Sequence, residues 1–136
     1  MSVAVSASPP PAPAVEWAML ADYVLVDNAG KLSIIGIFDR LFAAPFPSLH
    51  PQLFIVARWT GGPSKAEATE IRAWSPGGEL LVGAQQPLEF GPDGKANTIA
   101  RLSPLPLPGP GDYTLELLAG GASIHHIPLA VESAPS

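Results

Sequence analysis

The chain has 136 residues, enough to bury a hydrophobic core in one domain of ordinary size. It contains no cysteine, which excludes disulfides, iron–sulfur centres, cysteine-liganded zinc and thiol catalysis. Twelve acidic residues outnumber seven basic ones, giving a formal charge of -5, and the lysines and arginines form no cluster. We therefore expect no nucleic-acid partner, because such binding needs grouped positive charge.

The first segment, residues 1–15, is rich in Ala, Pro, Ser and Val and has no apolar periodicity. This composition predicts a disordered tail with polyproline character. No basic residue precedes Lys31, and the triple proline Pro9–Pro11 interrupts any apolar run, so no secretory signal is predicted. No stretch reaches the about 18 consecutive apolar residues of a membrane span. We therefore expect a cytoplasmic protein that contacts no membrane.

Turn-forming residues recur along the rest of the chain and separate short apolar segments, whereas no helical apolar stripe persists. This pattern predicts an all-β domain over residues 16–133, followed by a frayed end at 134–136. In chain order, the expected strands are Trp17–Asp27, Lys31–Leu41, Gln52–Thr60, Glu67–Ser75, Glu79–Ala84, Asn97–Leu105, Asp112–Ala119 and Ser123–Glu132.

Their lengths and hairpins favour a two-sheet antiparallel β-sandwich of about seven or eight strands, immunoglobulin-like in architecture. One hairpin is expected at Asp27–Lys31 and another at Gly120–Gly121. The strand Asp112–Ala119 alternates cleanly, which places Tyr113, Leu115 and Leu117 in the core. Pro128 cannot donate to a ladder, so its strand is expected at an edge or with a bulge there.

The second expected strand, Lys31–Leu41, lacks this alternation. Leu32, Ile34 and Phe38 share one face, while Ile35 and Ile37 lie on the other. The next strand is also apolar on both sides, with Phe54 and Val56 opposite its core residues. A strand with one solvent-exposed face alternates apolar with polar residues. These two strands do not alternate, so we expect both of their faces to be covered.

The second face of the Lys31–Leu41 strand has three candidate covers: the N-terminal tail, the long connection Ala43–Pro51 and another subunit. We therefore predict an interaction surface formed by Ile35, Ile37, Phe54, Val56 and Trp74. The corresponding hypothesis is a non-catalytic structural, adaptor or protein–protein interaction module. Its partner would be another protein or further copies of the chain, and no cofactor or metal is expected.

Two motifs resemble those of a known family. The first comprises Asp22-Tyr23, Asp27, Gly30-Lys31-Leu32 and Ile35-Gly36-Ile37-Phe38-Asp39. It is similar to the "DY…D..GKLNIIGIFD" segment of a family of small uncharacterised bacterial proteins. The similarity continues through His50-Pro51, Arg58 and the late PGDYTLEL element, and it spans Met19 to Val131. The resemblance implies a β-sandwich of unknown function and brings no catalytic residues.

Two other functions remain open from the residues. A hydrolase would use paired Asp and His side chains, drawn from Asp22, Asp39, His50 and the pair His125-His126. Asp27 suits a turn instead, because its side chain can bond nearby backbone N–H groups. His125 and His126 should point to opposite faces of a strand, so they cannot readily hold one metal together.

A small-ligand or carbohydrate-binding sandwich is the second alternative. It would expose Trp74, Trp59 and Tyr23 as one aromatic patch. Trp59 shares a face with Leu53 and Ile55, which indicates burial, whereas Trp74 shares a face with Glu70 and Arg72.

Overall fold

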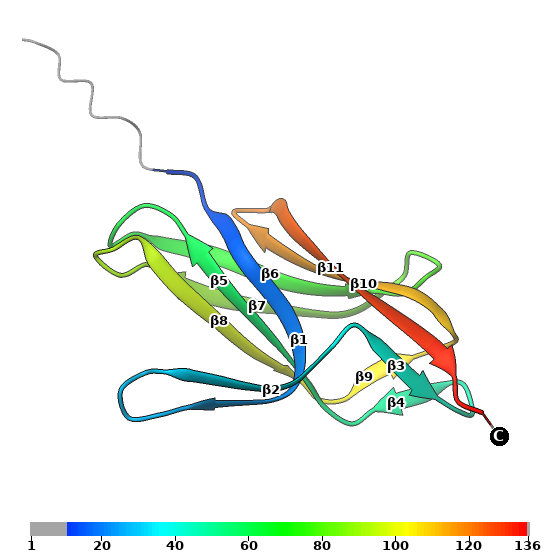
Figure 1. Ribbon diagram of the computed structural model, residues 1–136. Coiled ribbons are helices and arrows are strands. Elements are labelled where there is room, and N and C mark those ends of the chain that lie inside the picture. Colours follow the sequence, from blue (N-terminus) through cyan, green and yellow to red (C-terminus); the bar gives the residue numbers. More distant parts are fainter. Residues whose placement is uncertain (1–10, 136) are drawn as a thin grey trace, which may run out of the picture.

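A computed structural model describes residues 11–135, in which eleven strands and no helix occur (Figure 1). The strands are β1 (Ala14–Val26), β2 (Leu32–Phe38), β3 (Arg40–Ala43), β4 (Ser48–His50), β5 (Leu53–Thr60), β6 (Ala66–Trp74), β7 (Leu80–Glu89), β8 (Lys95–Leu102), β9 (Leu105–Leu107), β10 (Gly111–Ala119) and β11 (Ala122–Ser133). Between Pro11 and Pro135 there is accordingly no helix that could span a membrane.

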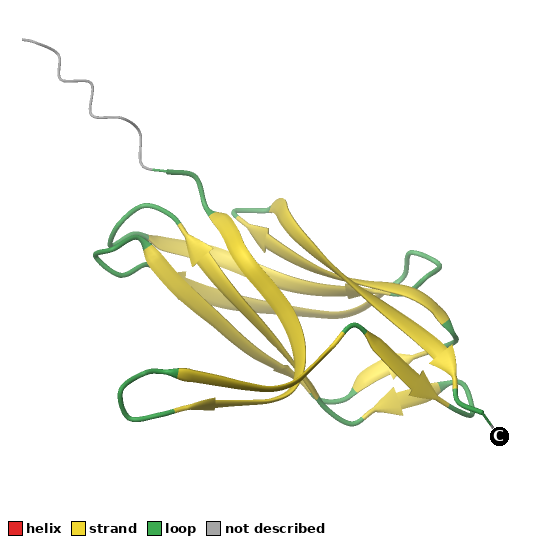
Figure 2. Ribbon diagram, viewed as in Figure 1, coloured by secondary structure: helices red, strands yellow, loops and turns green. Residues whose placement is uncertain are grey.

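Two sheets pack face to face, as Figure 2 shows. The first, sheet A, has the strand order β2-β1-β5-β8, and the second, sheet B, has the order β3-β11-β10-β6-β7. The short strands β4 and β9 form a separate ladder. Side chains from both sheets build one core, whose largest fully buried members are Trp59, Tyr113 and Phe90. The all-β, two-sheet sandwich predicted from the sequence is confirmed.

The strand count and one pairing differ from the prediction. The segment expected as one strand over Lys31–Leu41 bends at Asp39, so β2 joins sheet A and β3 joins sheet B. The carbonyl of Asp39 accepts a hydrogen bond from the Ala130 N–H at 2.9 Å, and Arg40 forms an ion pair with Glu132. These contacts align β3 parallel to β11, so the sandwich is not purely antiparallel.

A second predicted strand also divides. Asn97–Leu105 becomes the end of β8 and the start of β9, because Pro104 has no N–H with which to continue the ladder. The strand β9 instead pairs with β4, inside the connection Ala43–Pro51 that the sequence left without structure. These two divisions and the extra strand β4 raise the count from eight to eleven.

The ends of the domain reach further than expected. Strand β1 begins at Ala14, which pairs with Thr60, so the end of the predicted tail belongs to sheet A. Residues 1–10 of that tail lie outside the described residues. At the other end, the N–H of Ala134 donates to the carbonyl of Ala43 at 2.9 Å, which places residue 134 in the fold.

The late strands match their predicted faces. Tyr113, Leu115 and Leu117 are buried in the core. The Tyr113 hydroxyl donates to the Gly109 carbonyl at 2.5 Å and accepts from the Gly109 N–H at 3.2 Å, an arrangement similar to the tyrosine corner of immunoglobulin-like sandwiches. Strand β3 covers β11 only from Ala130 onward, so β11 has a free edge at Pro128, as predicted.

Candidate interaction surface

A two-stranded arm, residues 22–37, extends from one end of sheet A. Strand β1 pairs with β5 only as far as Ala21, which lies opposite Phe54. Beyond this point, within the part of the chain that the structure describes, it pairs with β2 alone. Figure 1 shows this hairpin at the lower left, separated from the two packed sheets. The arm therefore has two strands where the rest of sheet A has more, and its side chains have few neighbours.

The turn at the tip of the arm follows from its sequence. The Asp27 carboxylate accepts hydrogen bonds from the N–H groups of Ala29 and Lys31, at 2.8 and 2.9 Å. Gly30 has a φ of +80°, which a residue with a side chain rarely adopts. The Asp27 N–H donates to the Lys31 carbonyl at 3.0 Å and closes the hairpin. Both the predicted hairpin and the predicted turn role of Asp27 are confirmed.

One face of the arm carries four large apolar side chains that are about half exposed. Their exposed fractions are 48% for Tyr23, 48% for Leu25, 51% for Ile35 and 62% for Ile37. We call these four residues the arm face. Tyr23 lies opposite Ile35 in the ladder, so the members adjoin one another across the two strands. This exposure also shows that the connection Ala43–Pro51 does not cover the arm face, which corrects one of the three predicted explanations.

The arm face continues onto the outer surface of sheet A. The Tyr23 ring meets the Phe54 ring edge-on, with centroids 5.9 Å apart and planes at 66°. Phe54 is partly buried, and Tyr23, which lies opposite Ile35, connects it to the arm face. Val56 is fully buried, because it lies between Met19 of β1 and Ile99 of β8, so its predicted place in an exposed surface is wrong.

A shallow hollow lies where the arm joins the body. Its volume is about 280 Å³, and its lining includes Ile37 and Phe38 of β2 together with Ile127 and Pro128 of β11. The lining is mostly apolar, so the hollow extends the apolar surface around Ile37 toward sheet B. Asp39 at its margin is the charged residue of the lining.

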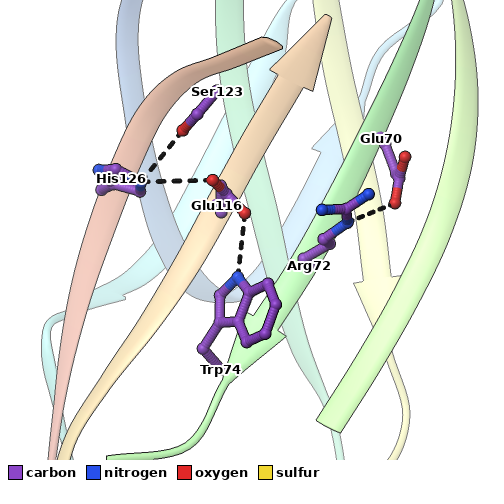
Figure 3. Close-up of polar contacts among 6 residues, drawn as sticks. All are labelled: Glu70, Arg72, Trp74, Glu116, Ser123 and His126. Carbon is purple, nitrogen blue, oxygen red and sulfur yellow. Dashed lines mark hydrogen bonds and ion pairs between the residues drawn. The ribbon is translucent and has the colours of Figure 1, made fainter. Parts of the chain in front are cut away.

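Trp74 does not join this surface, which corrects the fifth predicted member. It lies on the outer face of sheet B, where its indole N–H donates to Glu116 at 3.0 Å. Figure 3 shows Glu116 in contact with Trp74 and with His126, whose ring also meets Ser123. Hydrogen bonding from Ser123, with further contributions from Trp74 and His126, holds the pKa of Glu116 below its ordinary value.

The other ion pair in Figure 3, between Arg72 and Glu70, is an ordinary surface salt bridge. The Arg72 guanidinium contacts the Glu70 carboxylate at 2.6 Å, and this hydrogen bond raises the pKa of Arg72. Both side chains are about one third exposed, so the pair lies where solvent screens its charge.

The Ser123–His126–Glu116 contacts do not have the geometry of a catalytic triad. In a triad, one imidazole nitrogen faces the hydroxyl and the other faces the carboxylate. Here the same nitrogen, His126 Nε2, lies 3.1 Å from the Ser123 hydroxyl and 3.5 Å from a Glu116 oxygen. The histidine side chain is also 61% exposed. The cluster is therefore suited to fixing side chains on the surface of sheet B rather than to activating a nucleophile.

The residues of the hydrolase hypothesis are not joined by hydrogen bonds or ion pairs. Across residues 11–135, no such contact links a histidine to Asp22 or Asp39. His50 is partly buried next to the Phe38 ring, and its Nε2 has no hydrogen-bond partner within that range. In the same part of the chain, no group of three or more His, Asp or Glu side chains is arranged to hold a metal ion.

The aromatic residues of the ligand-binding hypothesis lie in three different parts of the fold. Trp59 is fully buried between the sheets, and its indole N–H donates to the Thr98 hydroxyl at 3.0 Å. Trp74 lies on the outside of sheet B, and Tyr23 lies on the arm of sheet A. No single aromatic platform containing all three is formed.

Comparison with known proteins places the chain in a family. A family model described as a family of unknown function matches residues 16–132. The chain belongs to this family, DUF6941. The match confirms the predicted membership in a family of unknown function, and it includes the whole arm as well as most of both sheets.

A comparison with curated proteins found no match. Among solved structures, 35 chains match. One is an immunoglobulin-like protein from Pseudomonas aeruginosa, at 10% sequence identity and a TM-score of 0.47, covering 89% of this chain and 97% of that one.

Two members of the arm face, Tyr23 and Leu25, are not among the surface residues predicted from the sequence. The signal was present, because the stretch Tyr23-Val24-Leu25-Val26 also lacks polar alternation. Its pairing with the doubly apolar β2 would have identified both residues as neighbours of Ile35.

Proposed function

We propose that this DUF6941 chain is a non-catalytic β-sandwich module that acts by contact with another protein, and that the arm face is its contact surface. The observation that carries the proposal is the half-exposure of four adjoining apolar side chains: Tyr23, Leu25, Ile35 and Ile37. Scattered exposed apolar residues are normal on a protein, but a contiguous group of them is typical of an interaction site.

The arm face can contribute usefully to binding. Complete burial of a large apolar side chain gives about 1.5–3 kcal/mol, so burying the exposed half gives about 1 kcal/mol. Four such residues would therefore contribute about 4 kcal/mol to a complex. Tyr23 adds a rigid aromatic ring held against Phe54, and aromatic anchors of this kind are enriched at the centres of interfaces.

The cytoplasmic location, the lack of a cofactor and the lack of a nucleic-acid partner stay predictions from the sequence. A module of this kind needs no reacting group, and what supports a binding role is the apolar character of the exposed arm rather than any arrangement of titratable residues.

Site-specific photo-crosslinking tests the proposal. A benzophenone amino acid replaces Ile37 in one variant and Leu80 in the control, expressed in cells of the organism that encodes the protein. Leu80 is a matched position, because it is 52% exposed and lies on β7 of the opposite sheet. We expect covalent protein adducts from position 37 and few from position 80. Absence of a protein adduct at position 37, or equal capture at both positions, would refute the proposal.

A further inference from the structure

We infer that the partner of the arm is a second copy of this chain, joined by antiparallel pairing of the two β2 edges about a two-fold axis at Ile35. This inference rests on the proposed contact function and names its partner. It follows from four features of β2: its place at the edge of the sheet, its composition, its register and the direction of its backbone groups.

The first feature is that the arm is incomplete as a sheet. Among residues 11–135, β1 has β2 as its one neighbour beyond Ala21, and β2 is the outermost strand of sheet A. An isolated two-stranded hairpin is marginal in water, whereas three or more strands with an apolar face are stable. Pairing two arms through β2 would make a four-stranded ribbon and would satisfy the free backbone groups of both edges.

The second feature is that the β2 edge is unprotected. Natural edge strands usually carry charges or proline, which discourage pairing with another chain. The other three edges of the two large sheets do so: β3 has Arg40, β7 has Pro87 and Glu89, and β8 has Lys95 and Arg101. By contrast, the seven residues of β2, Leu-Ser-Ile-Ile-Gly-Ile-Phe, include no charge and no proline.

Gly36 is the irregular position of this edge, with a φ of +72°. The register between β1 and β2 is the same on both sides of it, since Ala21 faces Ile37 and Tyr23 faces Ile35. The Asp22 side chain of β1 explains the glycine, because it would lie 2.4 Å from a Cβ at this position.

The third feature is charge complementarity in one register. Ile35 is the middle residue of β2, so a two-fold axis there pairs all seven residues, with Leu32 of one copy opposite Phe38 of the other. The same register places Lys31 of one copy opposite Asp39 of the other, once at each end of the ladder. Both residues are exposed and flank β2 directly. Opposite charges facing each other across strands stabilise the pair.

The fourth feature fixes the geometry at the axis. The Asp27 N–H donates to the Lys31 carbonyl, so these residues form a hydrogen-bonded pair. Pairs alternate along an antiparallel ladder, which makes Tyr23 and Ile35 a hydrogen-bonded pair as well. The backbone of Ile35 therefore points toward β1, and two copies of Ile35 would meet as a non-hydrogen-bonded pair with Cα atoms about 4.5 Å apart.

Cysteine crosslinking tests this geometry. A Cα separation of about 4.5 Å lies within disulfide range, and the chain has no natural cysteine to interfere. We expect Ile35→Cys to form a covalent dimer under mild oxidation. Leu25→Cys controls for general stickiness of the arm, and Leu80→Cys controls for exposure on another edge strand; both should stay largely monomeric on a non-reducing gel. Failure of Ile35→Cys to crosslink, or equal crosslinking of a control, would overturn the inference.

Charge complementation tests self-pairing independently. Since residue 35 faces its own copy, Ile35→Lys and Ile35→Glu should each be monomeric in sedimentation, at concentrations where the natural chain is dimeric. An equimolar mixture of the two variants should recover dimers. If either variant dimerises alone, or the mixture stays monomeric, the two-fold axis is wrong. Circular dichroism would verify that both variants keep the β-fold.

The two proposals fail separately. If Ile35→Cys does not crosslink while a benzophenone at position 37 captures a different protein, the second-copy inference falls and the contact function stands. If neither position yields an adduct, both proposals fall.

Discussion

Replacing Tyr113 with phenylalanine tests how the late PGDYTLEL element stabilises the sandwich. Tyr113 is only 2% exposed, and its hydroxyl makes two hydrogen bonds to the backbone of Gly109. The Tyr113→Phe variant keeps the ring in the core but leaves both the N–H and the carbonyl of Gly109 without that partner.

The expected loss follows from these two bonds. A neutral hydrogen bond contributes a net of about 0.5–1.5 kcal/mol, so the free energy of unfolding should fall by about 1–3 kcal/mol. The lower part of this range applies if water reaches Gly109, which is only partly buried. Urea unfolding followed by tryptophan fluorescence measures the change, with the slope of the transition expected to remain constant.

Tyr23→Phe is the matched control. It makes the same chemical change at a half-exposed tyrosine, whose hydroxyl has no hydrogen-bond partner within residues 11–135. Its effect on the free energy of unfolding should be below about 0.5 kcal/mol, as for most exposed substitutions. If the two variants lose equal stability, the Gly109 contact does not support the fold and the reasoning is wrong.

Two further predictions concern a titrating group and a backbone position. Because hydrogen bonds lower the pKa of Glu116 in the folded state, its carboxylate adds stability above the ordinary pKa, and this is lost as the pH falls through the lowered value. Glu116→Gln should therefore be less stable than the natural chain at neutral pH, with a difference that shrinks in acid; urea midpoints across that pH range would contradict this if the difference stayed constant. Gly36→Ala should cost about 1–3 kcal/mol in the same assay, because φ is +72° and the new Cβ would lie 2.4 Å from Asp22 Oδ2. Gly83→Ala, where nothing lies within 4 Å of the new Cβ, is its control and should be nearly neutral.

Local signals were sufficient for much of the fold. The turn at Asp27–Lys31 was predictable because one carboxylate and one glycine within five residues determine its geometry. The buried face of β10 was predictable because residues two apart in a strand point to the same side. Each of these features depends on neighbours in the sequence, so no knowledge of distant segments was required.

The composition of the candidate surface was only partly predictable. Phe54 and Val56 follow the same apolar pattern and lie on the same strand, which β1 and β8 flank on both sides. Val56 lies between the large side chains of Met19 and Ile99 and is fully buried, whereas Phe54 has the small Ala21 on one side and is only partly buried. Ile35 and Ile37 are more than half exposed because β2 has one neighbouring strand. Trp74 was grouped with them, but β6 belongs to the opposite sheet. The number and identity of neighbouring strands decide exposure, and a single strand's pattern does not contain them.

The amino-acid sequence by itself determined that the chain is all-β, where its hairpins turn and that β2 is apolar on both faces, since turn chemistry and side-chain alternation act over a few residues. Only the tertiary structure decided that the chain changes sheet at Asp39 and that β2 ends up at the edge of a projecting arm. Those outcomes depend on contacts between distant segments, such as Asp39 with Ala130 and Arg40 with Glu132. A doubly apolar strand can be central or unpartnered, and its neighbours in space determine which.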